Sequence, residues 1–487
     1  MKKDTWIALL FSFLALLLRI PFMSRFLYHW DSVNYALSLE RYDVRLHQPH
    51  PPGYFLYSMM GKLLDLVVSD ANTSLVIISV VFGSFGIGAI YLLGAKVFDQ
   101  RTGIFTALLG ISSPLHWFES EVALNYSLDF FLVSITALLC IAQWRGQHTL
   151  WFWSALLLGI TTGVRQVDIL FLGPLWLLAI IPLNWKQRIS SILVLLVTML
   201  AWLIPMAFLS GGIAGYLEAL TASSSGISSE SSFFDIKQLT VNLGRFTIYL
   251  AYGLGAALLS LVLGVWAMIR SWKTVLKDTR FLPFILWIIP STLFFIIIHI
   301  RQSGHIMLLL PALFVLAGWS ISVWMKSAHR QITGWVTAGM FVVINVFFFL
   351  AAPPSLFGSN QVPLQTPSRA SIVQRDRFLE TRIAAIRETF NPDSTTILAG
   401  GLNFRHPDYY LENYQMTSLS YRLSDQPVVL ENRVDTLVFF DDQAFPDFSD
   451  PRLQTINLLD GSQLRYLRWS PGTRIEISQS TIVFKEQ

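Results

Sequence analysis

The chain has 487 residues, of which 53% are hydrophobic and only 14% are charged. A soluble domain cannot hide that much apolar surface, so the composition excludes a soluble globular protein and indicates a polytopic membrane protein. The formal net charge of +4 says little for the whole chain, because the distribution of charge matters more. No nucleic-acid partner is expected. The single cysteine, Cys140, cannot form an intramolecular disulfide and is expected in the core.

The first apolar segment runs from Trp6 to Leu18 behind Lys2 and Lys3, as in a signal peptide or a first span. Bulky residues follow it where a signal peptide has small residues for cleavage, so we predict an uncleaved span. Spans need about 20 apolar residues. We expect eleven, near residues 5–23, 74–95, 103–118, 124–143, 150–164, 168–183, 189–209, 244–268, 281–299, 305–325 and 332–351. The shorter apolar helix at 53–68 is expected to lie at the membrane interface.

Basic residues in the loops predict a cytoplasmic N-terminus, which eleven spans convert into an extracytoplasmic C-terminus. Of the fifteen Asp and Glu residues before residue 351, only Asp4, Asp99 and Asp278 then fall on the cytoplasmic side. Anchoring in a membrane does not require acids on the outer face, so this asymmetry favours a reaction there. The location is expected to be the cell (inner) membrane.

After Ala352 the sequence becomes polar and mixed in charge. We predict a membrane module at residues 1–352, with a first outer loop at 24–73, and an extracytoplasmic α/β domain at 353–487. A helix is expected between Ser371 and Phe390, with strands at 395–398, 436–440, 464–469, 475–477 and 482–484. The serine-rich loop at about 211–243 predicts a mobile outer segment.

The outer loop after the first span reads HWDSVNYALSLERYDVRLHQPHPPGY and is rich in ionisable groups. In a helix over residues 30–39, one face carries Asp31, Asn34, Tyr35 and Ser38, which leaves Val33 and Leu37 to face lipid. A carboxylate at a membrane boundary is partly desolvated, so it suits a base that takes a proton from an alcohol or amine. The alternative is a helix-capping or solvated aspartate.

The prolines around His50 predict a rigid turn that opens the helix at 53–68. His50 would then lie at a helix N-terminus, where the dipole and a protonatable ring favour an anion. The alternative is a proline-rich connector in which the histidines have no role.

The chain resembles the GT-C glycosyltransferase superfamily in the order of two motifs: W-D-S-x-x-Y in the first outer loop, then H-P-P-G-Y before an apolar helix. The resemblance is greatest to protein O-mannosyltransferases and the lipid A aminoarabinose transferase. It covers residues 1 to about 350 in architecture, and its motifs match best over 28–60 and 112–130. It implies an inverting membrane enzyme that transfers a sugar from a polyprenyl-phosphate donor to a protein, lipid or glycan acceptor on the outer face.

The resemblance also implies roles for individual residues. Asp31 would be the general base, and an acid of the second outer loop, Glu119 or Glu121, would assist. The donor phosphate would be held by His50, Arg301, His305 and Arg245, because guanidinium forks suit phosphate; anchoring to lipid headgroups is the alternative, with equal weight for Arg245. The residues expected to line the site are Tyr35, Asn34, Tyr54 and Arg165. For Arg165, a simple ion pair with Asp168 is favoured over a catalytic role.

The sequence departs from the relatives in one respect. Many of them have a lysine before Pro-Pro, and His50 would bind phosphate more weakly or in a pH-dependent way. No cofactor is predicted beyond the lipid-linked sugar donor. A divalent metal at His29, Asp31, His47 and His50 is a minor alternative, because their spacing matches no standard site; no metal ligand is assigned.

Other classes of protein remain open. A secondary transporter has as many spans, and Asp129 is the main acid well inside one of them. A lipid-linked polysaccharide polymerase or ligase also uses such donors. A non-catalytic scaffold would not explain the acids on the outer face. The expected partners are membrane lipids, the donor and an acceptor that no motif identifies.

Overall fold

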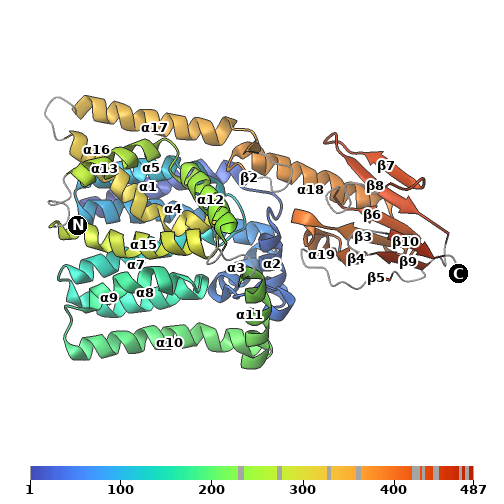
Figure 1. Ribbon diagram of the computed structural model, residues 1–487, viewed down its shortest axis with the longest axis horizontal. Helices are drawn as coiled ribbons and strands as arrows, with labels where there is room; N and C mark the ends of the chain where they lie inside the picture. The colour runs from blue at the N-terminus through green and yellow to red at the C-terminus, as the bar shows by residue number, and fades with distance from the viewer. Residues whose placement is uncertain are drawn as a thin grey trace. The chain divides into compact units, whose positions relative to one another are not determined.

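The computed structural model describes residues 2–228, 235–270, 277–325, 331–357, 364–418, 428–429, 434–441, 449–470, 474–477 and 482–485. The chain forms two compact units (Figure 1). We call residues 1–23 and 38–371 the helical unit, and residues 24–37 and 372–487 the sheet unit. The division differs from the expected boundary after residue 352, because part of the first outer loop belongs to the same unit as the C-terminal residues.

Helices account for nearly all regular structure of the helical unit. They are α1 (Lys2–Arg19), α3 (Phe55–Val68), α4 (Ala71–Val97), α5 (Gln100–Ser112), α6 (Pro114–Glu119), α7 (Tyr126–Trp144), α8 (Trp151–Val164), α9 (Asp168–Ile180), α10 (Trp185–Leu209), α11 (Gly212–Ser228), α12 (Ile236–Leu254), α13 (Ala257–Arg270), α15 (Leu282–Ile297), α16 (Leu310–Met325) and α17 (Gln331–Ala351). A short hairpin joins β1 (Ser355–Phe357) and β2 (Leu364–Gln365). Helix α2 (Trp30–Glu40) and helix α18 (Arg369–Thr389) each contain a boundary between the units.

Every predicted span coincides with helical structure, but not always with one long helix. Within the described residues, six helices are long and apolar enough to cross a membrane, and the pair α12–α13 adds a seventh if it counts as one span. The expected span at 103–118 is interrupted where α6 starts at Pro114, and α8 and α9 have only 14 and 13 residues. The eleven segments are therefore confirmed as helical, whereas eleven full-length spans are not.

The expected span at 244–268 is helical but bent, because α12 and α13 meet at an angle of 111°. Gly255 takes a positive φ of 53° at the break, and a Cβ there would come within 2.1 Å of Asn345 Oδ1. The Asn345 amide oxygen accepts a hydrogen bond from Ala256 N at 2.8 Å. A side chain of α17 thus satisfies a backbone group that the broken helix leaves unpaired.

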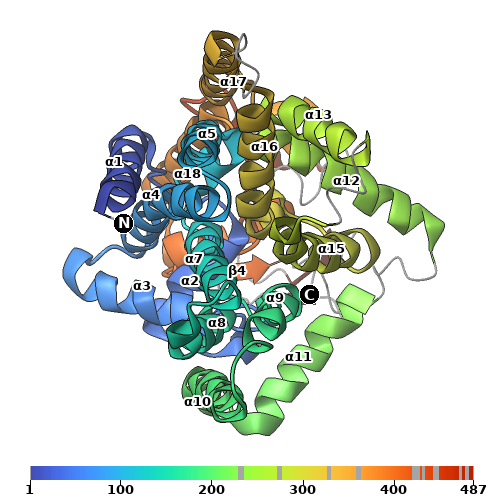
Figure 2. The same ribbon diagram turned by 90° about the vertical axis from the view of Figure 1, so that its left-hand side faces the viewer.

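Helix α4 is the centre of packing in the helical unit and contacts α1, α5 and α7 (Figure 2). Small residues allow these helices to approach closely. A Cβ on Gly88 of α4 would lie 2.4 Å from Ser12 Oγ of α1, and one on Gly103 of α5 would lie 2.9 Å from Ala95 Cβ of α4. Such contacts between small residues are typical of helices that associate within a bilayer, where apolar burial provides no net driving force between helices.

Two peripheral helices bear on the sequence predictions. Helix α3 exposes Leu63, Leu66 and Val67, which are 68–82% accessible, as expected of a helix that rests at a membrane interface. The loop predicted to be mobile is largely helical over its described part, which contains α11 and the start of α12; residues 229–234 lie outside the described residues.

The sheet unit contains a five-stranded sheet in the order β4-β3-β6-β8-β7. Its strands are β3 (Thr395–Ala399), β4 (Gln415–Ser418), β6 (Thr436–Phe439), β7 (Leu453–Asn457) and β8 (Gln463–Arg468). β3 is parallel to β4 and β6, while β8 is antiparallel to β6 and β7. A smaller sheet pairs β5 (Val428–Val429), β9 (Arg474–Ile477) and β10 (Ile482–Lys485). The expected α/β domain and its strands are confirmed.

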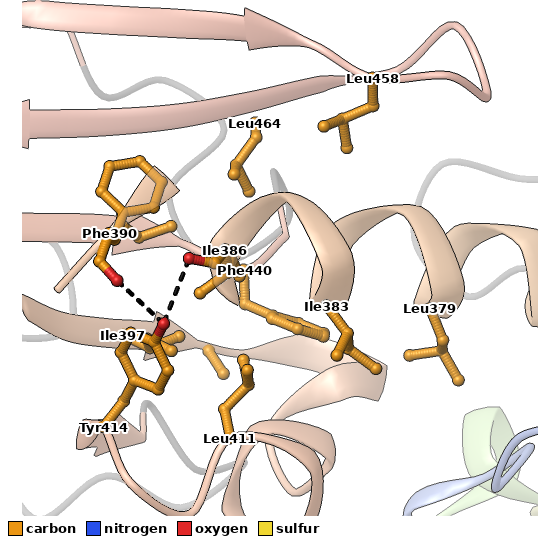
Figure 3. Close-up of a cluster of buried hydrophobic side chains, with 12 residues drawn as sticks. Leu379, Ile383, Ile386, Phe390, Ile397, Leu411, Tyr414, Phe440, Leu458 and Leu464 are labelled. Atoms are coloured by element: carbon orange, nitrogen blue, oxygen red, sulfur yellow. Dashed lines mark hydrogen bonds between the residues drawn. The ribbon is translucent and has the colours of Figure 1, made fainter. Parts of the chain in front are cut away.

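Helix α18 packs against the large sheet through one apolar face (Figure 3). Leu379, Ile383, Ile386 and Phe390 are buried there with Ile397 of β3. The Tyr414 hydroxyl lies 3.2 Å from Ile386 O and 3.0 Å from Phe390 O, so it satisfies carbonyls at the end of the helix. The short helix α19 (His406–Tyr410) belongs to the same unit.

Candidate active site

The H-P-P-G-Y turn has a conformation that its residue types make possible. Gly53 has a φ of 120°, and a Cβ there would come within 2.8 Å of Met206 Sδ. Hydroxyl groups hold the turn from two sides: Tyr42 donates to Gly53 O at 2.5 Å, and Tyr216 donates to Pro52 O at 3.0 Å. The turn therefore has one defined shape, and it ends where α3 begins, as predicted.

Tyr54 connects this turn to a buried arginine. Its ring centroid is 4.8 Å from that of His50, and its hydroxyl is close enough to Arg165 to interact electrostatically. Arg165 also lies over the ring of Tyr126, with its Cζ atom 5.6 Å from the centroid. His50, Tyr54 and Arg165 were predicted at the site and lie together, whereas Tyr126 was not anticipated.

The partner of Arg165 differs from the expected one. Its Nη1 atom lies 3.2 Å from Asp129 Oδ2, and both residues are buried. Asp168 is also buried and interacts with the same guanidinium, but it is not within ion-pair distance in the described structure. The expected pairing of Arg165 with Asp168 is therefore wrong as a direct ion pair in the described structure, although Asp168 N donates to Arg165 O at 3.1 Å; Asp129, the acid inside a span, provides the counter-charge.

The loop between α15 and α16 supplies two histidines. The ring centroids of His299 and His305 are 5.5 Å apart, and His305 lies 6.1 Å from the ring of Tyr126. Gly304 makes this approach possible, since a Cβ there would be 2.1 Å from the Tyr126 ring. Tyr126 in turn donates through its hydroxyl to Gln302 Oε1 at 2.8 Å.

Arg245 of α12 reaches the same loop. Its Nη1 atom donates to Ile300 O at 3.3 Å, and Tyr249 from the next turn donates to Arg301 O at 2.8 Å. Burial, together with the charges of Arg165 and Arg245, lowers the pKa of His299 to about 4. Both guanidinium groups therefore act on the same histidine.

We call His50, Arg165, Arg245 and His305 the cationic cluster; His299 lies beside it, and its lowered pKa leaves it uncharged at neutral pH. The contacts of Tyr54 and Tyr126 connect His50, Arg165 and His305, and Arg245 joins them through its hydrogen bond to Ile300 O, in the loop that carries His305. Three predicted phosphate-binding residues lie in it, and Arg301 lies in the same loop, its amide 3.5 Å from His305 Nδ1. Guanidinium and imidazole groups gathered in this way favour a phosphate.

The two acids left open by the sequence have different surroundings. Glu119 accepts a hydrogen bond from Ser303 at 3.3 Å and so contacts the loop of the cationic cluster. Burial raises the pKa of Glu119 to about 8, against the effect of that hydrogen bond. Glu121 lies beside Arg19 and Trp117 instead, and burial raises its pKa well above the ordinary range against the attraction of Arg19.

Asp31 belongs to the sheet unit, in the first turn of α2. It is buried, and its Oδ2 atom lies 3.3 Å from His29 Nδ1, which is also 3.1 Å from the Asp31 amide. Asn34 accepts a hydrogen bond from Arg405 Nε at 3.0 Å. Tyr35 is buried as well, and so is Val33, which was wrongly expected to face lipid.

Sequence reasoning missed Tyr126, His299 and the role of Asp129 as a counter-ion. His299 directly precedes the predicted phosphate-binding stretch, so a histidine at a span end was the available signal. No group of three or more His, Cys, Asp or Glu side chains comes together as a metal-ligand set in the part of the chain that the structure describes.

The fold is that of the GT-C membrane glycosyltransferases. The family model for the N-terminal domain of the protein O-mannosyl-transferase TMEM260 matches residues 41–189, which include His50, Glu119 and Arg165. A comparison with curated protein sequences gives no match.

Two solved enzymes have this fold. ArnT from Cupriavidus metallidurans bound to undecaprenyl phosphate superposes with a TM-score of 0.55 at 13% identity, covering 95% of this chain and 97% of ArnT. The oligosaccharyltransferase of Archaeoglobus fulgidus in complex with zinc and sulfate superposes with a TM-score of 0.53 at 11% identity, covering 90% and 67%. The predicted fold class is confirmed.

The Asp129–Arg165 pair yields a first prediction. Asp129→Asn removes the direct counter-charge of a buried guanidinium, so we expect the free energy of unfolding to fall by about 3–5 kcal/mol. Asp168→Asn leaves the pair intact and is the matched control, with a smaller expected loss. Thermal and denaturant unfolding of the purified protein in detergent measures both. Equal losses in the two variants would contradict the assignment of Asp129 as the partner.

A second prediction concerns Glu119. A carboxyl group whose pKa is raised to about 8 by folding stabilises the protein fully only below its unfolded pKa, near 4.5. That stability is lost as pH rises from about 4.5 towards 8, because the unfolded state releases its proton first. We expect the melting temperature of the wild type to fall across this window relative to Glu119→Gln, which cannot ionise. Parallel pH profiles for the two proteins would refute the raised pKa.

Proposed function

We propose that the protein is an integral-membrane glycosyltransferase that moves a sugar from a polyprenyl-phosphate donor to an acceptor on the outer face of the membrane. The cationic cluster is the observation that carries the proposal, because it gathers imidazole and guanidinium groups in a chain with the GT-C fold. The crystal structure of ArnT, which has the same fold, contains undecaprenyl phosphate. The sugar is a hexose or a pentose, and the N-terminus is cytoplasmic.

The cationic cluster binds the donor phosphate in this proposal. Breaking the bond between the anomeric carbon and the phosphate oxygen leaves an electron pair on that oxygen, so charge grows there. Arg245, His305 and His50 face that growing charge, and positive groups fixed before the reaction stabilise it most effectively. Arg165 contributes less net charge, because Asp129 already neutralises it. Of the two acids in the second outer loop, Glu119 is the one that assists the reaction, because it contacts the loop between α15 and α16 and Glu121 lies beside Arg19 instead.

Asp31 is the general base. It takes the proton of the acceptor hydroxyl or amine as that group attacks the anomeric carbon from the side opposite the phosphate, which inverts the centre. Proton transfer to a positioned carboxylate contributes about 10²–10⁴-fold to a rate. The products are the glycosylated acceptor and the polyprenyl phosphate, and the proton remains on Asp31 until solvent removes it. Every step uses residues of the chain itself.

Lipid and glycan mass spectrometry on cells that lack the protein tests this proposal. We expect a polyprenyl-phosphate sugar to accumulate and one glycosylated product to disappear, and the lost mass then identifies the sugar. Wild type should restore the product, and Asp31→Asn should lower its rate of formation by about 10²–10⁴-fold. The control is Glu40→Gln, since Glu40 is exposed at the end of the same helix.

Three outcomes contradict parts of the proposal. Full restoration by Asp31→Asn would refute the general base and leave the transferase class intact. Unchanged glycans in the knockout would favour a secondary transporter. Accumulation of unpolymerised or unligated glycan units would favour a lipid-linked polysaccharide polymerase or ligase.

A further prediction tests the phosphate-binding role. Arg245→Gln removes a charged donor, worth about 1.5–3 kcal/mol, so kcat/KM for the lipid-linked donor should fall about 10–100-fold. Lys237→Gln on the same helix removes an exposed positive charge outside the cluster and should have little effect. Steady-state kinetics with a defined polyprenyl-phosphate sugar measures both variants. Equal behaviour of the two variants would argue that Arg245 only anchors the helix to lipid headgroups.

A further inference from the structure

The segment that leads to Asp31 is fixed by side chains from the end of the sequence. Residues 24–28 lie in neither a helix nor a strand, so their backbone groups bond outside regular structure. Residues of α18 and α19 provide partners, and all of them belong to the sheet unit.

Asp376 of α18 makes the largest contribution. Its carboxylate accepts hydrogen bonds from the Ser24 hydroxyl at 3.0 Å, from the Arg25 amide at 3.1 and 3.2 Å, and from the Phe26 amide at 3.1 Å. Asp376 is only 5% exposed. Hydrogen bonds to a charged acceptor are stronger than those between neutral groups, so a buried carboxylate with several donors is a firm anchor.

Further contacts continue the anchor towards Asp31. The Leu27 amide donates to the Tyr410 hydroxyl at 2.8 Å, and Leu27 O lies 2.9 Å from His406 Nε2. Arg375 donates through Nε to Tyr28 O at 2.9 Å and through Nη1 to Asn403 Oδ1 at 2.6 Å. Helix α2 begins two residues later, at Trp30, whose ring packs 5.8 Å from that of Phe404.

The segment is also held beyond Asp31. Arg405 donates to Asn34 Oδ1 at 3.0 Å, and Asp408 holds Arg405 in place through an ion pair of 2.8 Å. Contacts on both sides of Asp31 fix where its helix begins and how that helix is rotated. C-terminal residues therefore hold the chain on both sides of Asp31.

We infer that the C-terminal part of the chain positions the general base, with Asp376 as the principal positioning residue and Tyr410 as a second one. This inference rests on the proposed function of Asp31, since it assigns the C-terminal residues a part in the same reaction. None of these residues needs to touch a substrate. A displacement of about 1 Å at a reacting group costs on the order of 10²-fold in rate, so a loosened anchor should be visible in turnover.

Two variants test the inference, with one matched control. Asp376→Asn keeps the shape of the side chain but replaces one acceptor oxygen with a donor that faces amide donors. Tyr410→Phe removes only the acceptor of the Leu27 amide and keeps the ring, which lies 5.5 Å from that of Phe26. The control is Glu380→Gln, one helical turn from Asp376: its ion pair with Arg25 reaches the same segment, but the two side chains are 49% and 60% exposed.

Hydrogen–deuterium exchange of the purified full chain follows peptides covering residues 24–37, and transfer kinetics are measured on the same samples. We expect faster exchange in Asp376→Asn, with a turnover number about 10–100-fold lower and a nearly unchanged KM for the donor. Tyr410→Phe should change both quantities in the same direction by less. Glu380→Gln should leave both within about twofold, as an exposed pair contributes little.

The outcomes separate the inference from the proposed function. Unchanged exchange in Asp376→Asn, or faster exchange with full turnover, would overturn the positioning role. A loss in Glu380→Gln as large as that in Asp376→Asn would do the same, because any contact of the segment would then suffice. A wild type without transfer activity would instead refute the proposed function, and the exchange experiment alone would then decide whether Asp376 anchors the segment.

Discussion

Burial of charge is the constraint on which this structure depends. An ionised side chain removed from water costs several kcal/mol unless a counter-charge or several hydrogen bonds replace the lost solvent. Arg165 meets this requirement with Asp129, and Arg19 does so with His116 at 2.9 Å and Glu121 nearby. Asp376 meets it without any cation at hydrogen-bonding distance in the described structure, through hydroxyl and amide donors. Each solution fixes several segments at once.

The two units apply this constraint differently. In the helical unit the charged groups connect helices: Arg165 follows α8 and Asp129 lies in α7, so their ion pair joins two helices. In the sheet unit a carboxylate on a helix connects to the backbone of a segment without regular structure. An ion pair fixes two side chains, whereas a carboxylate with amide donors fixes the path of the chain itself. The second arrangement suits a loop that must present one carboxyl group in one direction.

Much of the fold could be predicted because its determinants are local. Long apolar runs predict helices, and the spacing of Leu379, Ile383 and Ile386 predicts the buried face of α18. The H-P-P-G-Y turn was likewise recognisable from its prolines and glycine. Span lengths were less predictable, because the break at Gly255 depends on Asn345 from a helix far along the chain.

The candidate site depends more on contacts between distant parts of the chain. Residue types indicated His50, Arg245 and His305, but the preference for Glu119 over Glu121 depends on a hydrogen bond to Ser303, which lies 184 residues away in the sequence. Asp376 lies 352 residues from Ser24, and no pattern in either segment indicates the other. From the sequence alone, an aspartate in an amphipathic helix is interpreted as a solvated surface residue. Its function as an anchor emerges when tertiary structure brings the backbone amides of Arg25 and Phe26 to its carboxylate. The C-terminal residues are therefore best understood through the segment they hold, since folding of the two ends of the chain together gives Asp31 its surroundings.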